Sequence, residues 1–331
     1  MIKYSRIIIA FLLTISLLYI TYINSEGRPK LYTHTENGFT FEMTSVPKGT
    51  EFTTVEITLN IIPPDGKDKI DSNLTVYYNS TKFGQDITTP LYKYRSIKMN
   101  LKDSLTNLYS ITQSIGKKGK RAYYYFQIRD NIGSVRASFK MPEGKPFLLK
   151  FIGEVPSFVL ISHIFLIFAT VFFVMLGTVH SFHVITSGNG LSSMAKHFLI
   201  ANILLFISCY PIGFAMNWYA FDCFWEGVPF GTDATDNKTQ IVFVYLLLVN
   251  FLTIASITKG KIGKNIFSPK TRGWFGIVSC LIMLTMYLIP HSIQFAPSDT
   301  YLFCYSLIGL AILIYLYGLF FGKKYPYNSK S

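Results

Sequence analysis

Polar residues that could bind a metal ion are concentrated in one short loop of an otherwise apolar stretch. Residues 225–239 read WEGVPFGTDATDNKT and carry three carboxylates, one lysine and one asparagine between two long apolar runs. Imidazole suits Zn, Cu or Fe, and a carboxylate can complete the coordination shell. We therefore predict a transition-metal site formed by His163, His291, Asp233 and Asp236, which are expected at one membrane level. The spacing itself is not specific, because no pair lies at a ligand interval such as His-x3-His.

The same loop also fits a structural interpretation. Asp, Thr and Asn directly before an apolar run are typical of a turn and a helix N-cap, and residues 233–237 have this composition. A helix N-terminus with bare amides beside Lys238 would equally suit an anion. The further residues of the candidate loop site are Trp225, Gly231, Asn237, Lys238 and Thr239.

The histidines also permit a b-type haem protein, which needs histidine pairs near both membrane faces. His163 with His291 would form one pair, and His180 or His183 with His197 the other. Helix geometry argues against two haems on one helix face, because the 17 residues from His163 to His180 give a rise of about 25 Å and point the side chains about 100° apart. The alternatives are a hydrogen-bonded packing role for His163 and solvated, interfacial positions for the others.

Four cysteines lie in the apolar half of the chain. Cys223 and Cys304 are expected near the outer membrane face, where a disulfide between them is conceivable. No pair has CxxC spacing, so Cys209 and Cys280 are interpreted as buried small apolar residues.

Composition indicates a membrane protein. The 331 residues are 50% hydrophobic, 16% aromatic and 15% charged, which is too apolar for an ordinary soluble protein. The net charge is +13, but residues 24–155 hold 19 of the 31 basic residues beside 13 acidic ones, so that region carries only +6. No basic stripe with a recognition motif accompanies the charge, and we therefore exclude nucleic acid as a partner.

The N-terminus is predicted to be an uncleaved signal anchor, residues 1–25. Lys3 and Arg6 precede an uncharged run, Ile7–Ile23. This run is long for a signal-peptide core and lacks a small-residue cleavage site.

Residues 26–154 are predicted to form an all-β sandwich outside the cytoplasm. Short alternating segments rich in Thr, Val, Tyr and Phe are separated by turn residues. The segment AYYYFQIRDNIGSVRASFKM resembles the last hairpin of immunoglobulin-like and fibronectin-like domains. The predicted strands are Gly38–Thr44, Thr53–Ile62, Leu74–Tyr78, Tyr92–Met99, Leu108–Gln113, Arg121–Arg129, Ser134–Met141 and Phe147–Ile152.

Residues 155–322 are predicted to form a five-helix transmembrane bundle, followed by a cytoplasmic tail at 323–331. Each apolar run is long enough to cross a hydrocarbon core of about 30 Å. Pro211 and Gly213 are expected to kink the second bundle helix. The predicted spans are Phe158–Leu176, Phe198–Met216, Ile241–Ile257, Trp274–Pro290 and Tyr301–Phe321.

The distribution of charge predicts the orientation. The connection 258–273 has five basic and no acidic residues, and the tail adds three lysines, so both belong in the cytoplasm. The loop at 218–240 and the β domain then face outward, and we expect the cytoplasmic (inner) membrane of a bacterium.

Two segments resemble a set of uncharacterised bacterial multi-pass membrane proteins. The segments are Phe224–Thr239, FWEGVPFGTDATDNKT, and Ile289–Ser292, IPHS. The resemblance covers the membrane half and implies a multi-pass topology, but it carries no activity. The chain departs from the pattern at Thr232, where some members have histidine, and this weakens a metal interpretation that uses this position.

Two functions follow as hypotheses. The first is a membrane-integral redox or metal-associated protein with a b-type haem or a transition metal at the outer site. The second is a non-catalytic accessory, assembly or structural subunit whose loop is only a cap and whose β domain binds a partner. The expected partners are membrane lipid and other membrane or extracytoplasmic subunits.

Overall fold

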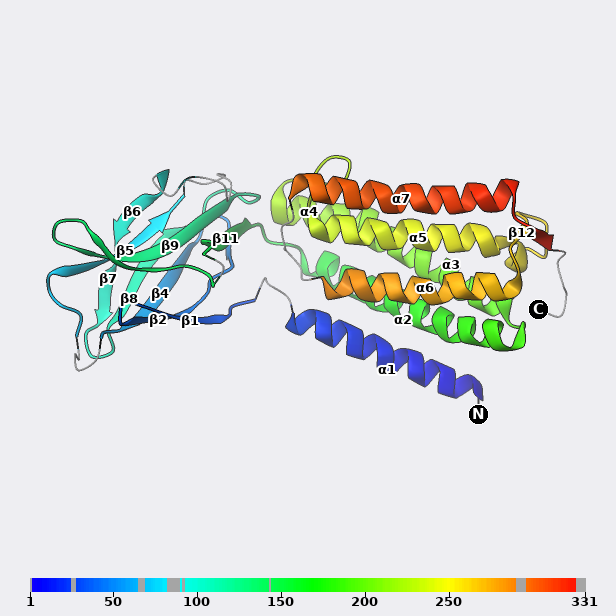
Figure 1. The fold of residues 1–331 in the computed structure, drawn as a ribbon, viewed down its shortest axis with the longest axis horizontal. Helices are drawn as coiled ribbons and strands as arrows, with labels where there is room; N and C mark the ends of the chain where they lie inside the picture. The colour runs from blue at the N-terminus through cyan, green and yellow to red at the C-terminus, as the bar shows by residue number, and fades with distance from the viewer. Residues whose placement is uncertain are drawn as a thin grey trace. The chain divides into compact units, whose positions relative to one another are not determined.

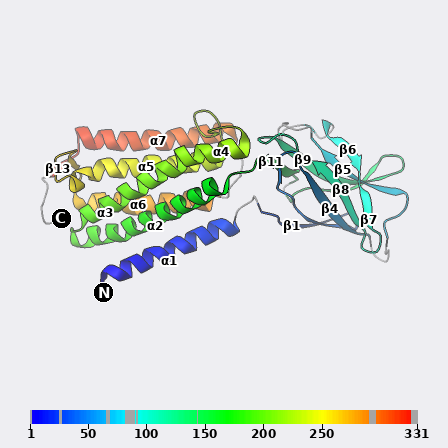
Figure 2. The ribbon, with the colours of Figure 1, turned by 180° about the vertical axis from the view of Figure 1, so that it is seen from behind.

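The computed structural model of the chain describes residues 2–24, 28–64, 69–81, 90, 93–142, 144–289 and 296–325. These residues form two compact units (Figures 1 and 2). The helical unit comprises Met1–Ser25, Pro156–Asn217 and Cys223–Ser331, and the β unit comprises Glu26–Val155 and Trp218–Asp222.

The described part of the β unit contains two sheets. One has the strand order β1-β2-β4-β8-β7, and the other has the order β3-β11-β9-β5-β6, with β10 also paired to β9. The strands are β1 (Leu31–Glu36), β2 (Phe39–Thr44), β3 (Lys48–Thr50), β4 (Thr54–Ile62), β5 (Leu74–Ser80), β6 (Arg95–Lys98), β7 (Asn100–Asp103), β8 (Leu108–Ser114), β9 (Arg121–Asp130), β10 (Val135–Phe139) and β11 (Phe147–Ile152).

The two sheets share one apolar core. Alternate residues of a strand point to the same face, so Tyr124, Phe126 and Ile128 of β9 enter the core together. Phe41 of the first sheet and Phe139 of the second stack with ring centroids 5.4 Å apart. Burying each such side chain contributes about 1.5–3 kcal/mol, so these residues hold the two sheets together.

The predicted hairpin is confirmed as β9 and β10. The Asp130 carboxylate accepts hydrogen bonds from the backbone N–H groups of Ile132 at 3.1 Å and Ser134 at 2.9 Å. Gly133 has φ of +85°, a conformation that glycine adopts without a steric penalty. This turn therefore fixes the register of the two strands.

Each predicted strand contains or overlaps an observed strand, but β1, β3 and β7 were missed. β1 is an edge strand with mostly exposed residues, and β3 has only three residues. Neither has an apolar alternation for a sequence pattern to detect. β7 directly follows β6 in the chain but pairs in the other sheet. The predicted strand Tyr92–Met99 therefore includes β6 but not β7.

The β unit also includes the segment Trp218–Asp222. The Gly153 N–H donates to the Ala220 carbonyl at 2.9 Å, and Lys117 forms an ion pair with Asp222 at 2.5 Å. The Lys117 ammonium lowers the pKa of the Asp222 carboxyl from its ordinary value. The segment is therefore held by both a backbone and a charged contact.

Six helical segments of the described chain are long and apolar enough to cross a membrane. The segment α3–η2–α4 is one continuous span in which η2 is a π-helix that contains Pro211, at the position of the predicted kink. The helices and the strands outside the two sheets are α1 (Ile2–Ile23), α2 (Ser157–Ser187), α3 (Leu191–Ile207), η2 (Ser208–Ile212), α4 (Gly213–Phe221), α5 (Ala234–Ile257), β12 (Asn265–Ile266), α6 (Pro269–Leu288), α7 (Pro297–Phe320) and β13 (Lys324–Tyr325).

The first bundle helix is longer than predicted. α2 continues to Ser187 and ends at Gly188, whose φ is +73°. The apolar pattern weakens after Leu176, but a helix continues until a residue with left-handed backbone provides a C-cap. The end of α2 is therefore determined by the backbone conformation of Gly188 and not by hydropathy.

α5 lies at the centre of the bundle and packs against α3, α6 and α7, while α2 packs against α1, α3 and α6 (Figure 1). The contact between α2 and α6 depends on glycine. A Cβ placed on Gly276 would lie 2.0 Å from Ser181 Oγ, and one on Gly273 would lie 2.8 Å from Ile185 Cγ1. Small residues let helix backbones approach closely in membranes, so these glycines set the distance between α2 and α6.

Candidate functional site

The candidate loop leads from α4 into α5 and is anchored by an aromatic cluster. The ring of Trp225 stacks on Tyr210 with centroids 5.7 Å apart and meets Phe214 edge to face at 6.1 Å. The Trp225 indole N–H also donates to the Val228 carbonyl at 3.3 Å. Trp225 is therefore a packing residue that holds the loop against η2 and α4.

Asp233 caps α5, as the N-cap interpretation predicted. Its carboxylate accepts from the N–H groups of Thr235 at 2.8 Å and Asp236 at 3.2 Å. These are two of the N–H groups that a helix start leaves without intrahelical partners. The Asp233 N–H in turn donates to the Glu226 carbonyl at 2.8 Å, so the cap also closes the loop.

The side chains of Asp236 and Asn237 form hydrogen bonds with the backbone of the preceding loop. The Asp236 carboxylate accepts the Glu226 N–H at 2.8 Å and the Asn217 side-chain amide at 3.2 Å. The Asn237 side-chain oxygen accepts the Val228 N–H at 2.7 Å. Two adjacent residues of α5 thus satisfy the loop backbone ten and nine residues earlier in the chain.

The glycines of the loop are required by close backbone approaches. A Cβ on Gly231 would lie 2.3 Å from the Glu226 carbonyl oxygen. A Cβ on Gly227 would lie 2.8 Å from the Trp225 ring and 2.9 Å from Asp236 Cβ. The WxGxxxG spacing of the sequence is therefore explained by loop geometry alone.

Lys238 lies inside the helical unit with 6% of its surface exposed. Its ammonium group donates to the Ile289 carbonyl at 3.1 Å, directly after α6 ends. Thr239 donates its hydroxyl to the Thr235 carbonyl at 2.8 Å. Lys238 thus connects α5 to the end of α6, whereas the Thr239 hydroxyl forms a hydrogen bond within α5.

His163 does not join the loop carboxylates. Its Nδ1 lies 3.3 Å from both the carbonyl oxygen and the hydroxyl of Ser208, at the start of the π-helical segment. This contact matches the packing role that the sequence left open. Within the described residues, no group of three or more His, Cys, Asp or Glu side chains could hold a metal ion. His291 lies outside the described residues, so its predicted role stays a prediction.

At the opposite end of the bundle, His180 and His197 contact each other directly. Their rings are stacked at a centroid distance of 4.8 Å and an angle of 15°. A haem with two axial histidines places its macrocycle between the rings, and the stacked rings leave no space for it. In this arrangement the pair does not fit that haem, and neither the haem nor the metal prediction gains support.

The four cysteines are free, and Cys304 is buried with 2% of its surface exposed. The conceivable Cys223–Cys304 disulfide is absent.

Sequence reasoning also missed Asn217, whose side-chain amide donates a hydrogen bond to the Asp236 carboxylate. Its signal was a single amide in an otherwise apolar helix segment.

No known protein family matches the chain, and no curated protein matches it either. The interpretation of the site therefore rests on the geometry of its own residues.

Proposed function

We propose that the chain is a multi-pass protein of the bacterial inner membrane and a relative of the multi-pass proteins that share its FWxGxPFGxDxTDNKT loop. In this proposal, the anchor α1 and five further spans cross the bilayer, and the β unit is an extracytoplasmic, immunoglobulin-like sandwich. The support is the charge at one end of the helical unit, where the α5–α6 connection and the C-terminal segment concentrate lysine and arginine. We call this the basic end, and the opposite end, which carries the loop, the loop end.

Labelling of single cysteines is expected to report this orientation. In a background with Cys223 replaced by alanine, Ser104→Cys in the β unit should react with a membrane-impermeant maleimide added to spheroplasts. Lys264→Cys at the basic end should react only after the membrane is permeabilised. Both positions are exposed, so access to the reagent decides the result. Reaction of Lys264→Cys in intact spheroplasts would reverse the proposed topology.

The function that we favour is a non-catalytic accessory or assembly subunit whose β unit binds a partner. The observation that carries this proposal is that the polar side chains of the loop form hydrogen bonds with the loop's own backbone. Asp233, Asp236 and Asn237 each satisfy backbone N–H groups of the chain itself. A redox or metal-associated function with His163, Asp233 and Asp236 as ligands gains no specific support from the described contacts.

The β unit offers a defined surface for such a partner. Leu105, in the β7–β8 turn, is 85% exposed, and Ile132, in the β9–β10 turn, is 86% exposed. The chain before β5 connects the two turns, because Asn107 Oδ1 accepts the Ile70 N–H at 3.4 Å and the Asn131 amide donates to Asn73 Oδ1 at 3.2 Å. Loops at one end of a sandwich commonly carry binding function. We call these two turns the β tip.

Replacing the apolar residues of the β tip is expected to release the partner. We expect the wild-type chain, solubilised gently from its native membrane, to migrate as a larger complex on a native gel. The variant Leu105→Ser/Ile132→Ser should migrate as the free protein, because apolar side chains at the centre of an interface cost about 1–2 kcal/mol each when truncated. Both side chains are exposed, so the fold should remain intact.

A matched variant tests whether loss of the complex is specific to the β tip or follows from making any exposed apolar position polar. Leu31→Ser changes an apolar residue of β1 that is 71% exposed and lies outside the β tip, and it should leave the complex unchanged. The proposal fails if the wild type migrates alone, or if purified protein carries a Soret band or stoichiometric metal.

A further inference from the structure

The loop end of the helical unit contains a cavity of mixed polarity between α5, α6 and α7. Its volume is about 550 Å³. This size lies in the range of about 300–1,000 Å³ that is typical of small-molecule sites. Its polar wall contains Asn237, Lys238, Asp299 and Thr300, while Met286 and Phe303 belong to its apolar wall.

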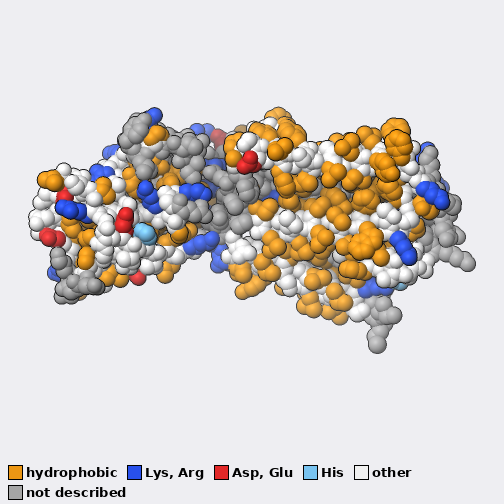
Figure 3. All heavy atoms as spheres, in the orientation of Figure 1, with side chains coloured by type: hydrophobic (Ala, Val, Ile, Leu, Met, Phe, Trp, Pro, Cys, Tyr) orange, Lys and Arg blue, Asp and Glu red, His pale blue; other side chains and the backbone are white. Residues whose placement is uncertain are grey.

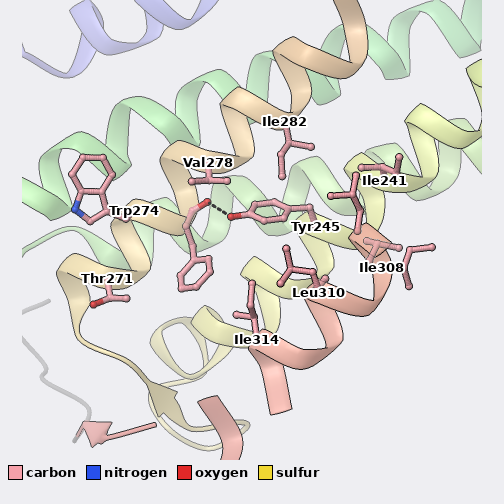
Figure 4. Close-up of a pocket in the computed structure, with 13 residues that line it drawn as sticks. Ile241, Tyr245, Thr271, Trp274, Val278, Ile282, Ile308, Leu310 and Ile314 are labelled. Atoms are coloured by element: carbon pink, nitrogen blue, oxygen red, sulfur yellow. Dashed lines mark hydrogen bonds between the residues drawn. The ribbon is translucent and has the colours of Figure 1, made fainter. Parts of the chain in front are cut away.

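A separate apolar groove lies between the same three helices (Figure 4). The groove has a volume of about 420 Å³ and shares Ile241 with the cavity. The Tyr245 hydroxyl, one of the few polar groups in the groove, donates to the Phe275 carbonyl at 3.2 Å. Hydrophobic side chains also cover much of the visible face of the helical unit (Figure 3). The groove is therefore suited to a hydrocarbon chain.

The dimensions agree with an acyl chain of one membrane leaflet. Thr300 lines the cavity and Ile314 lines the groove, and both belong to α7. Their separation of 14 residues corresponds to about 21 Å along a helix. Half of a hydrocarbon core of about 30 Å is about 15 Å, so cavity and groove together are long enough for the chain.

The polar wall carries one charge of each sign and a buried amide. Lys238 is 6% exposed, whereas Asp299 is an exposed residue in the first turn of α7, and the two form no ion pair within 4.0 Å among the described contacts. Asn237 is 3% exposed, and its side-chain Nδ2 has no hydrogen-bond partner among the described residues. This nitrogen has almost no accessible surface, so the charged groups of Lys238 and Asp299 determine what the cavity can bind.

The geometry points to a binding site for a phospholipid whose headgroup carries both a phosphate and a primary amine. The Lys238 ammonium receives the phosphate oxygens, Asp299 receives the ammonium group of the lipid, and the groove receives one acyl chain. An anionic headgroup without the amine would leave Asp299 facing negative charge. This inference does not depend on the proposed accessory function.

Native mass spectrometry of the full-length protein in detergent tests the site. The protein is mixed with equal amounts of phosphatidylethanolamine, phosphatidylglycerol and diacylglycerol with identical chains. We expect retained phosphatidylethanolamine to exceed phosphatidylglycerol about fivefold, the effect of one exposed charge contact. Asp299→Asn should abolish this preference, and Lys238→Met should reduce retention of both phospholipids to the level of diacylglycerol.

Glu154→Gln, which changes another exposed carboxylate outside the cavity, is the matched control and should retain the fivefold preference. The Asp299→Asn comparison is decisive even if Lys238→Met does not fold, because Asp299 is exposed. Equal retention of the three lipids by the wild type, a preference for phosphatidylglycerol, or an unchanged preference in Asp299→Asn would each overturn the inference.

Discussion

Asp236→Ala is expected to destabilise the helical unit by about 3 kcal/mol. The substitution leaves the half-buried Glu226 N–H and Asn217 amide without the carboxylate that they contact at 2.8 Å and 3.2 Å. A donor left unsatisfied away from water costs about 1–3 kcal/mol. For a unit of this size, such a loss corresponds to a decrease in Tm of about 6–12 °C. The loop and the start of α5 should open first.

The native cysteines provide the measurement for this prediction. All four belong to the helical unit and none to the β unit, and Cys209 and Cys304 are 6% and 2% exposed. A dye that fluoresces on reaction with thiols therefore follows unfolding of the helical unit alone during heating. The Tm of each variant is compared with that of the wild type in the same detergent.

Glu226→Ala is the matched control. It removes a carboxylate from the same loop but keeps the backbone N–H and carbonyl of residue 226, which make the hydrogen bonds described above. Its Tm should stay within about 2 °C of the wild-type value, as for a surface substitution within ±0.5 kcal/mol. If Asp236→Ala melts at the same temperature as Glu226→Ala, the carboxylate does not hold the loop.

Gly276→Val is expected to separate α2 from α6 and to destabilise the helical unit by about 3 kcal/mol, the upper range for overpacking a close contact. The first added carbon would already lie 2.0 Å from Ser181 Oγ and 2.9 Å from the Phe198 ring. Thiol reactivity during heating reports the decrease in Tm. The buried Cys209 of the same apolar core should also react faster at low temperature.

Two further variants distinguish this steric effect from an effect of backbone entropy. Gly309→Ala in α7 adds a Cβ that meets no atom within 4 Å, so it should leave stability unchanged or raise it by about 0.5–1 kcal/mol. Ser181→Gly should recover part of the stability that Gly276→Ala loses, because it removes the nearest obstacle. Equal effects of alanine at positions 276 and 309 would contradict the assigned contact.

Local sequence patterns predicted the elements of this chain well. Hydropathy located the six apolar segments, and alternation located the strand Arg121–Arg129 and its turn at Asp130. The cap at Asp233 was also predictable, because its hydrogen bonds go to Thr235 and Asp236, two and three residues away. Each of these features depends on interactions between near neighbours in the chain.

The candidate site itself was only partly predictable. The sequence predicted that Asp236 and His163 lie at one membrane level, but it did not determine whether they meet. The structure directs Asp236 to Glu226 and Asn217 and His163 to Ser208. The stacking of His180 on His197 likewise depends on how α2 and α3 pack.

The sequence alone determined where the apolar helices and most of the strands lie, where charge lies along the chain and that Asp233 caps α5. The tertiary structure decided which polar groups satisfy one another and that Lys238 and Asp299 line a common cavity. The physical reason is that periodicity defines the faces of an element, whereas the axial shift and rotation between packed helices select the partners of each side chain. Asp236 and Lys238, two residues apart on α5, therefore have different roles, one closing the loop and the other tying α5 to α6.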